Sequence, residues 1–288
     1  MKTISIKSFF LFVSLFILMS CGKAEQENVL VVSVEPQKAL LKEIVGDRFE
    51  VVAMLPPGAN PEVFEPGMQT RQQLETAKAF MTTGYLPFET KLAEANGGRV
   101  KVVNTSKGIQ PVYGTHGHAH EGHSHVGGDG ADPHIWTSVK NAKIIAKNMY
   151  ESVIELDPEG KEYYTPRYEK LITRLDSLDN AFDKRLSAEG ITKSFAIWHP
   201  SLSYFARDYD LEQIAVGYEN KEVSVSTQSK VIDEVKEEGV KVFFFQKTYD
   251  STQATTLNDA MGTTLVPINP LDYDWERQLE GIVSALCQ

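Results

Sequence analysis

The amino-acid sequence predicts an α/β protein of two lobes, each a parallel β-sheet flanked by helices, joined by one long backbone helix. Short apolar runs rich in β-branched residues alternate with segments of helical periodicity, which is the pattern of βα units in a parallel sheet. The alternation occurs in both halves of the 288-residue chain, which is long enough to bury two cores. A single long amphipathic segment lies between the halves.

Residues 29–156 are expected to form the N-terminal lobe. The strand candidates are short and apolar, and the segments between them repeat apolar residues every three or four positions. We expect strands over residues 29–34, 51–54, 80–83 and 100–103, and helices over 37–45, 70–78, 87–95 and 138–156.

Residues 190–288 show the same alternation and are expected to form the C-terminal lobe. No repeat of the sequence itself is evident, so the likeness between the halves is architectural. We expect strands over residues 195–198, 211–216, 240–246 and 264–268, and helices over 201–208, 227–238, 252–261 and 275–286.

Residues 157–189 form the amphipathic segment between the lobes. Pro166 favours the first turn of a helix, so we expect the helix to begin near Thr165 or to kink there. A coiled-coil arm would need a partner, and we therefore expect a backbone helix that packs across both lobes. Its apolar stripe comprises Tyr164, Tyr168, Leu171, Leu175, Leu178, Phe182 and Leu186.

The N-terminus has the features of a bacterial lipoprotein signal peptide. Its apolar run over residues 9–19 follows two lysines and is too short to span a bilayer. The run ends in Leu18-Met19-Ser20-Cys21, which resembles a lipobox, so we expect removal of residues 1–20 and acylation of the Cys21 thiol. The alternative is an ordinary signal peptide with a chance cysteine. Residues 21–28 would tether the protein, anchored by lipid, in the periplasm.

Cysteine content and net charge restrict which disulfides can form and which partners the protein can bind. With Cys21 acylated, no disulfide can form within the chain, and Cys287 is expected to be a buried or frayed thiol rather than a metal ligand. The formal charge of −10 becomes −12 when residues 1–20, with two lysines and no acid, are removed. No basic patch is evident, which argues against nucleic acid and anionic membrane surfaces as partners, whereas a negative field suits a cation.

Five of the seven histidines lie within ten residues, inside the glycine-rich segment 113–130. Such a segment is expected to be a loop that does not pack. Imidazole is a preferred ligand of zinc, copper and nickel, so the loop should bind several ions weakly. The alternative is a solvated low-complexity insert without a ligand. The histidines are His116, His118, His120, His123 and His125.

The other two histidines have different surroundings. His134 directly precedes an expected helix, and His199 directly follows an expected strand. Ligands of open parallel sheets bind beyond the carboxyl ends of strands, and residues 56–66 and 269–274 are further strand exits with candidate ligands. A single histidine is more often a core or capping residue. Two such positions in opposite halves, together with a histidine-rich insert, favour a metal site.

Several motifs, in order, resemble those of the zinc/manganese solute-binding lipoproteins of metal ABC transporters, the ZnuA/TroA type. The resemblance begins near residue 29 and extends to the C-terminus, and the histidine-rich loop is typical of the zinc-specific members. The matching segments are Pro-Gly-Ala-x-Pro-x-x-Phe-Glu-Pro at 57–66, Asp-Pro-His-Ile-Trp at 132–136, Trp-His-Pro-Ser-Leu-Ser-Tyr-Phe-Ala at 198–206, the strand at 239–245 and Asn-Pro-Leu at 269–271.

The resemblance implies a metal site and also shows departures from the family pattern. Members usually have histidine at the position of Glu62, aspartate at that of Asn269, and often an acid at that of Gln246. The implied ligands are therefore Glu62, His134 and His199. The candidates for a fourth ligand are Asn269, Asp272 and Asp274. Two imidazoles and a carboxylate suit Zn²⁺ with one position left for water, and would tolerate Mn²⁺ or Fe²⁺.

The implied function is that of a periplasmic, high-affinity zinc receptor and not of an enzyme. It would capture the metal in a cleft between the lobes, as a monomer, and deliver it to the membrane subunit of an ABC transporter. One alternative is a zinc hydrolase, but no His-Glu-x-x-His motif is present and no further histidine remains to act as a base. The others are a passive zinc buffer or adhesin and a manganese or iron receptor.

Overall fold

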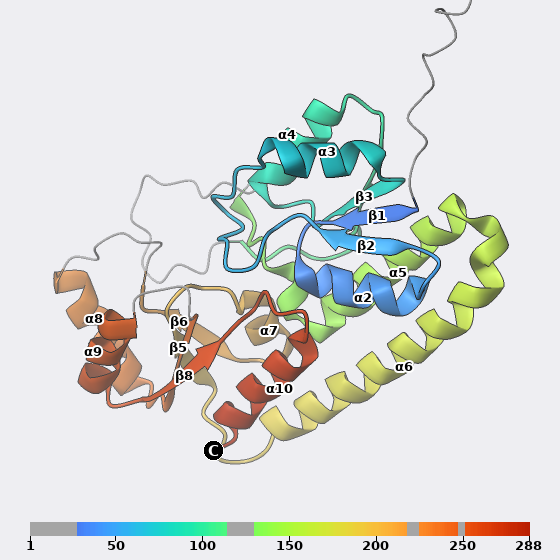
Figure 1. The fold of residues 1–288 in the computed structure, drawn as a ribbon. Helices are drawn as coiled ribbons and strands as arrows, with labels where there is room; N and C mark the ends of the chain where they lie inside the picture. Colours follow the sequence, from blue (N-terminus) through green and yellow to red (C-terminus); the bar gives the residue numbers. More distant parts are fainter. Residues whose placement is uncertain (1–27, 114–129, 218–224, 247–250) are drawn as a thin grey trace, which may run out of the picture.

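The computed structural model describes residues 28–113, 130–217, 225–246 and 251–288. The signal peptide, nearly all of the tether with Cys21, and the five loop histidines lie outside these residues. The described chain forms two four-stranded parallel sheets, one from each half of the sequence (Figure 1). The fold class predicted from the sequence is confirmed.

The two sheets share one topology. Their strand orders are β2-β1-β3-β4 and β6-β5-β7-β8, so in each sheet the first strand lies between the second and the third. The strands of the first sheet are β1 (Val29–Val32), β2 (Glu50–Ala53), β3 (Ala79–Thr82) and β4 (Lys101–Asn104). Those of the second are β5 (Ser194–Ile197), β6 (Glu212–Ala215), β7 (Val242–Gln246) and β8 (Thr264–Ile268).

Burial of the strands follows their position in the sheets. The central strands β3 and β5 are buried along their whole length, whereas the edge strands β4 and β8 are largely exposed or only partly buried. A central strand of a parallel sheet has helices on both faces, which is why its sequence is a continuous apolar run.

Helices cover both faces of each sheet. In Figure 1, α3 and α4 lie on one side of the first sheet and α2 and α5 on the other. Helices α8 and α9 pack against one face of the second sheet and form a separate, smaller core with it. The other face of that sheet packs with α7 and α10 and belongs to the main core. The helices are α2 (Glu35–Val45), α3 (Met68–Thr76), α4 (Pro87–Asn96), α5 (Val139–Leu156), α7 (Ser203–Asp208), α8 (Val225–Glu237), α9 (Ser251–Met261) and α10 (Trp275–Leu286).

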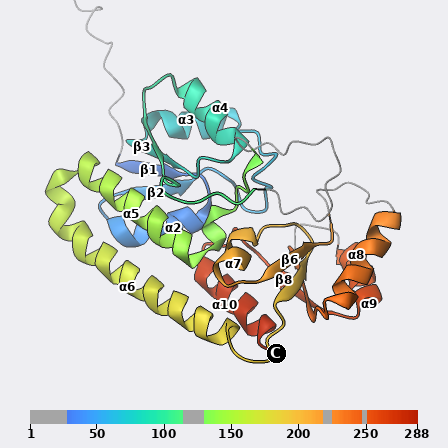
Figure 2. The same cartoon turned by 180° about the vertical axis from the view of Figure 1, so that it is seen from behind.

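The long helix α6 (Lys161–Leu186) runs along both lobes (Figure 2). It begins at Lys161 and not near Thr165, because a short 3-10 turn at Pro158–Gly160 leads directly into it, so Pro166 lies inside the helix. Arg174 of α6 pairs with Glu43 of α2 at 2.6 Å and with Glu276 of α10 at 2.9 Å. The helix therefore binds both lobes as a backbone element and is not a free coiled-coil arm. In the described part of the chain, no helix is both long and apolar enough to cross a membrane.

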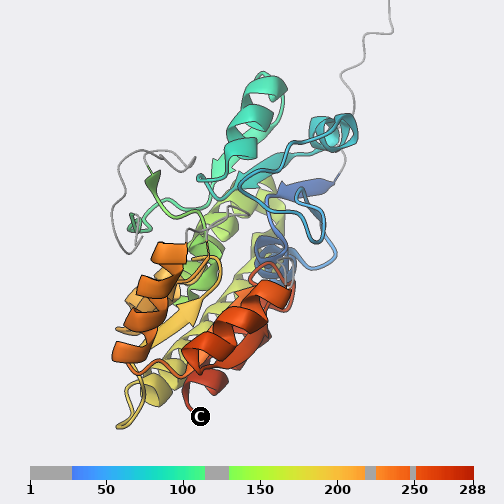
Figure 3. The ribbon, with the colours of Figure 1, turned by 90° about the vertical axis from the view of Figure 1, so that its left-hand side faces the viewer.

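The two lobes also contact each other directly, one above the other in Figure 3. The Tyr204 hydroxyl donates to the Asp132 carbonyl oxygen at 2.8 Å, and the Arg207 guanidinium donates to the Gln110 carbonyl oxygen at 2.8 Å. Ser138, at the start of α5, donates to the Asp208 carboxylate at the end of α7. The main apolar core is continuous across these contacts, so the segments that carry the candidate ligands pack against one shared core.

Candidate metal centre

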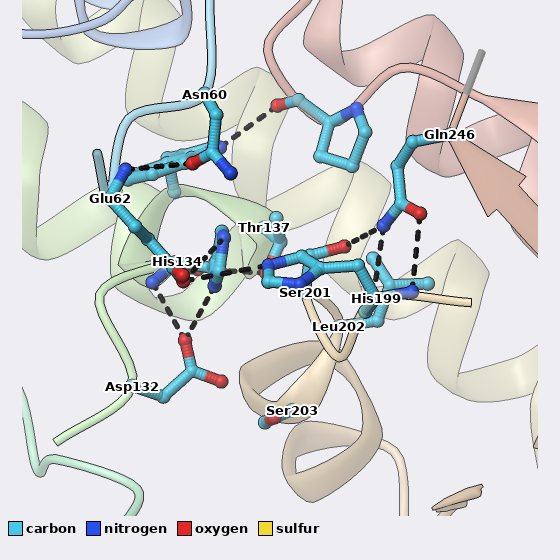
Figure 4. Close-up of polar contacts among 12 residues, drawn as sticks. Asn60, Glu62, Asp132, His134, Thr137, His199, Ser201, Leu202, Ser203 and Gln246 are labelled. Atoms are coloured by element: carbon cyan, nitrogen blue, oxygen red, sulfur yellow. Dashed lines mark hydrogen bonds and ion pairs between the residues drawn. The ribbon is translucent and has the colours of Figure 1, made fainter. Parts of the chain in front are cut away.

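Three of the candidate ligands, Glu62, His134 and His199, lie together between the lobes (Figure 4). One ligand atom from each lies within 4.8 Å of the other two. The Glu62 Oε1 atom is 3.5 Å from Nε2 of His199 and 3.9 Å from Nε2 of His134. The two imidazole rings face each other edge to face, with centroids 5.2 Å apart.

Glu62 is positioned by the loop that follows β2. The Asn60 side-chain oxygen accepts a hydrogen bond from the Glu62 backbone N–H at 2.9 Å, which closes a turn that asparagine favours. Two residues after Glu62, the Phe64 ring packs edge-on against Phe88 of α4, with centroids 5.2 Å apart. The backbone of the loop is therefore fixed on both sides of the carboxylate.

His134 is oriented by Asp132, two residues earlier in the chain. The Asp132 carboxylate oxygen Oδ1 lies 2.9 Å from Nδ1 of His134 and also accepts from the His134 backbone N–H at 2.8 Å. Since an ionised carboxylate only accepts, Nδ1 carries the proton and Nε2 is left to bind a metal. Burial raises the Asp132 pKa, but the hydrogen bonds of His134 and the charge that His134 carries when it is protonated outweigh burial, so the Asp132 pKa is lowered.

His199 comes from the chain that leaves β5, and Gln246 at the end of β7 holds its backbone. The His199 N–H donates to the Gln246 side-chain oxygen at 3.3 Å, and the Gln246 amide nitrogen donates to the His199 carbonyl oxygen at 2.9 Å. Both histidines are buried, with 4% and 8% of their surface exposed for His134 and His199, whereas Glu62 is partly exposed.

The dimensions of this group fit one transition-metal ion. Tetrahedral zinc with bonds of roughly 2.0–2.1 Å separates neighbouring ligand atoms by about 3.3 Å. The separations of 3.5 and 3.9 Å from the Glu62 oxygen are close to that value. Two neutral imidazoles and one carboxylate are ligands that zinc accepts, and three protein ligands leave a fourth coordination position.

Two of the remaining candidate ligands do not belong to this group, and for Asn269 the role of fourth ligand stays a prediction. Asp272 and Asp274 are not among the described carboxylates that lie within 4.8 Å of its ligand atoms. Their loop is held by its own hydrogen bonds, because Asn269 Oδ1 accepts from the Leu271 N–H at 3.2 Å and Asp272 Oδ1 accepts from the Asp274 N–H at 2.9 Å. Cys287 is also outside the group, at the end of α10.

Three residues around the site have roles that the sequence reasoning missed. Asp132 belongs to the Asp-Pro-His segment, so its spacing to His134 was visible, but its hydrogen bond was not inferred. Gln246 was noted only as a departure from an acidic residue. Gln213, whose side chain contacts the segment after His199, has no local pattern that would have identified it.

Comparisons with known proteins agree with this fold. The family model for ZnuA, the periplasmic component A of a zinc-uptake complex, matches residues 30–280. A zinc-bound deletion mutant of ZnuA has 27% sequence identity and superposes with a TM-score of 0.79, with 90% of this chain and 98% of that chain covered.

The alignments with two curated relatives cover different shares of those relatives. The high-affinity zinc uptake system protein ZnuA of Bacillus subtilis is 28% identical over 260 residues, which cover 86% of this chain and 80% of the relative. The zinc-binding lipoprotein AdcA of Streptococcus pneumoniae is 26% identical over 269 residues, which cover 88% of this chain and 53% of the relative. The chain thus spans about half the length of this streptococcal relative. With the family model matching most of the sequence, the chain belongs to the ZnuA family of periplasmic zinc-uptake components.

Proposed function

We propose that this protein is a periplasmic receptor that captures zinc between its two lobes and delivers it to the membrane subunit of an ABC transporter. The observation that carries the proposal is the convergence of Glu62, His134 and His199 on one point. Glu62 and His134 come from the N-terminal half of the chain and His199 from the C-terminal half, so a bound ion would bridge the two lobes. Zinc is the cargo of this site.

The choice of zinc over other divalent metals rests on the ligands and on the family. Zinc stands well above manganese and iron in the affinity series for nitrogen and oxygen ligands, and imidazole suits it better than it suits manganese. The relatives from Bacillus subtilis and Streptococcus pneumoniae are named for zinc uptake and zinc binding. Mn²⁺ and Fe²⁺ are therefore weaker candidates, which the carboxylate of Glu62 would still admit.

Membership in a family of uptake components excludes the zinc-hydrolase alternative, because these are receptors and not enzymes. A passive zinc buffer would share the site but not the delivery step. Uptake of radioactive zinc by cells that lack this protein distinguishes the two, since a receptor is required for fast uptake at low zinc concentration and a buffer is not.

The proposal includes a lipid anchor at the N-terminus and two lobes of defined extent. The mature protein would begin at Cys21 with an acylated thiol and act as a monomer. Its lobes would comprise residues 29–156 and 190–288, with residues 157–189 between them. The mass of the mature N-terminus tests the anchor directly: an unmodified residue 21 in the wild-type protein would contradict it.

The zinc site is tested by competition with a chromophoric chelator, using wild-type protein and a variant that lacks residues 114–128. We expect the wild type to bind one ion tightly and others weakly, because dense histidines on one segment offer several alternative coordination sets. The deletion should remove the weak sites and leave the tight site nearly unchanged. Loss of the tight site on deletion would mean that the histidine-rich segment itself is the receptor.

A further inference from the structure

Two glutamine side chains flank the segment 199–203, which begins with a candidate metal ligand. The segment leaves the end of β5, and β5 lies between β6 and β7 in the second sheet. Gln213 belongs to β6 and Gln246 to β7, so one glutamine comes from each neighbouring strand. Neither residue is among the candidate metal ligands.

Gln246 holds the start of the segment with both ends of its amide. Its oxygen accepts from the His199 N–H at 3.3 Å, and its nitrogen donates to the His199 carbonyl oxygen at 2.9 Å. The same nitrogen also donates to the Ser201 hydroxyl at 2.8 Å. The Gln246 side chain is buried, with 6% of the residue exposed, so water competes poorly for these hydrogen bonds (Figure 4).

Gln213 holds the end of the segment in the same manner. Its oxygen accepts from the Leu202 N–H at 2.8 Å, and its nitrogen donates to the Ser203 hydroxyl at 3.0 Å. Leu202 and Ser203 are both buried and lie at the start of α7. Together the two amides fix the backbone from His199 to Ser203 from opposite sides.

The second glutamine also reaches the other candidate histidine. Tyr204 directly follows Ser203, and its hydroxyl donates to the Asp132 carbonyl oxygen at 2.8 Å. Asp132 in turn accepts from Nδ1 of His134. Gln213, on β6 of the C-terminal lobe, is thus linked to His134 in the N-terminal lobe through the backbone of residues 203–204 and the hydrogen bonds of Tyr204 and Asp132.

We propose that Gln213 and Gln246 are positioning residues: their hydrogen bonds hold the segment that carries His199 in its metal-binding arrangement, and Gln213 also steadies His134 through Tyr204 and Asp132. An amide suits this role because it both donates and accepts and stays neutral at every pH. Methionine has a similar length but offers neither a strong donor nor a strong acceptor. The inference rests on the proposed zinc site, and it adds that zinc affinity depends on two side chains that do not touch the ion.

The test compares three identical substitutions, Gln246→Met, Gln213→Met and Gln37→Met, in the mature full-length protein. Gln37 is the matched control because it is a fully buried glutamine of the first lobe, which accepts from the Ser33 N–H at 3.0 Å and donates to the Thr105 hydroxyl at 2.9 Å. Zinc affinity is measured by chelator competition, ligand geometry by the visible absorption of the Co²⁺ form, and metal-free stability by urea unfolding.

We expect Gln246→Met and Gln213→Met to weaken zinc binding about 10- to 100-fold and to change the cobalt spectrum, as loss of outer-shell partners does in other metal sites. Gln37→Met should lose stability but keep wild-type affinity and spectrum. Should Gln246→Met fail to fold, Gln246→Glu replaces it. The carboxylate still accepts from the His199 N–H but no longer donates, so an intermediate loss of affinity is expected.

Wild-type affinity and spectrum in both site variants would overturn the proposal while leaving the zinc site intact. An equal loss of affinity in all three variants would also overturn it, because the effect would then follow stability and not position. A wild-type protein that binds no zinc tightly is a different outcome, which contradicts the proposed function itself.

Discussion

The indole Nε1 of Trp136 donates a hydrogen bond to the carbonyl oxygen of Pro270 across 2.9 Å. Trp136 belongs to the N-terminal lobe and lies two residues from His134, while Pro270 belongs to the loop that follows β8 in the C-terminal lobe. That loop was a candidate source of a fourth metal ligand. The hydrogen bond joins this loop to the opposite lobe, close to His134.

Metal binding is expected to change the intrinsic fluorescence of the protein. The rings of Trp136 and His134 are 5.3 Å apart, and Trp198 adjoins His199, so an ion on the two imidazoles alters the surroundings of two indoles. The measurement uses the variant without residues 114–128, titrated with zinc. Trp136→Phe should remove much of the change and Trp275→Phe should preserve it. An unchanged spectrum at confirmed zinc occupancy would contradict the arrangement of the ligands.

Glu62 should matter far more for tight zinc binding than Asn269. Glu62→Ala removes the oxygen that faces both imidazoles, whereas Asn269→Ala removes a side chain that bonds within its own loop. We expect a loss of at least 10-fold for the first variant, little change for the second, and near-wild-type affinity for Glu62→His, which restores a nitrogen ligand. Titrations in the loop-deleted protein check this. If Glu62→Ala binds like the wild type while Asp272→Ala or Asp274→Ala does not, the ligand assignment is wrong.

Asp132→Asn should weaken zinc binding by about 10- to 100-fold with little change in shape or packing. The asparagine amide can place a donor where the carboxylate accepted, which favours the wrong tautomer of His134 and turns a protonated Nε2 toward the metal. Chelator competition measures the loss, and the nitrogen chemical shifts of the His134 ring report the tautomer. A wild-type tautomer with weakened binding would mean that the negative charge of Asp132, and not its hydrogen bond, is what matters.

The contact of Arg48 and Asp157 with Tyr164 of α6 should stabilise the protein near neutral pH and lose this effect in strong acid and in strong alkali. The Tyr164 hydroxyl and the Arg48 guanidinium hydrogen-bond the Asp157 carboxylate and lower the pKa of Asp157 below its ordinary value of 3.8. Burial, followed by the Asp157 charge and hydrogen bond, raises the pKa of Tyr164 to about 12. A lowered Asp pKa adds stability that is present above 3.8 and lost in stronger acid. A raised Tyr pKa adds stability that is present below 10 and lost toward 12.

Urea unfolding of the wild type and of Tyr164→Phe across this pH range checks the prediction. The stability difference between the two proteins should be widest near neutrality and should narrow both below about pH 4 and above about pH 10. Tyr163→Phe is the control, because Tyr163 is a neighbouring, partly exposed tyrosine of the same helix. A difference that stays constant from acid to alkali would show that these groups do not contribute through their ionisation.

Much of the fold was predictable because local sequence patterns determine it. The strand at Thr264–Ile268 and the helix at Trp275–Leu286 have the predicted bounds, and the other elements differ by a few residues. Of the two options predicted at Pro166, a helix start near Thr165 is wrong, because α6 begins at Lys161. Pro166 favours a first turn in general, but here the buried side chain of Tyr164 and the preceding 3-10 turn extend the helix ahead of the proline.

The site was predictable only in its outline. Placing His199 after a strand, and Glu62 after another, follows from the topology of parallel sheets. The convergence of Glu62 with the two histidines depends on how the two lobes pack, through contacts between residues far apart in the chain such as the Trp136 to Pro270 hydrogen bond. No periodicity or spacing encodes such contacts, and the same holds for the two glutamines beside His199.

The two sheets come from separate halves of the chain, which bears on the order in which the protein folds. Each sheet is made from an unbroken stretch of chain, so each lobe can reach its native topology without the other. The three ligands converge only after the lobes have docked, so an intermediate with two complete but undocked sheets would have no tight site. Zinc at 100 times its dissociation constant adds about 2.7 kcal/mol to any state that binds it over one that does not. The cargo would therefore act as a late folding cofactor that selects the docked arrangement.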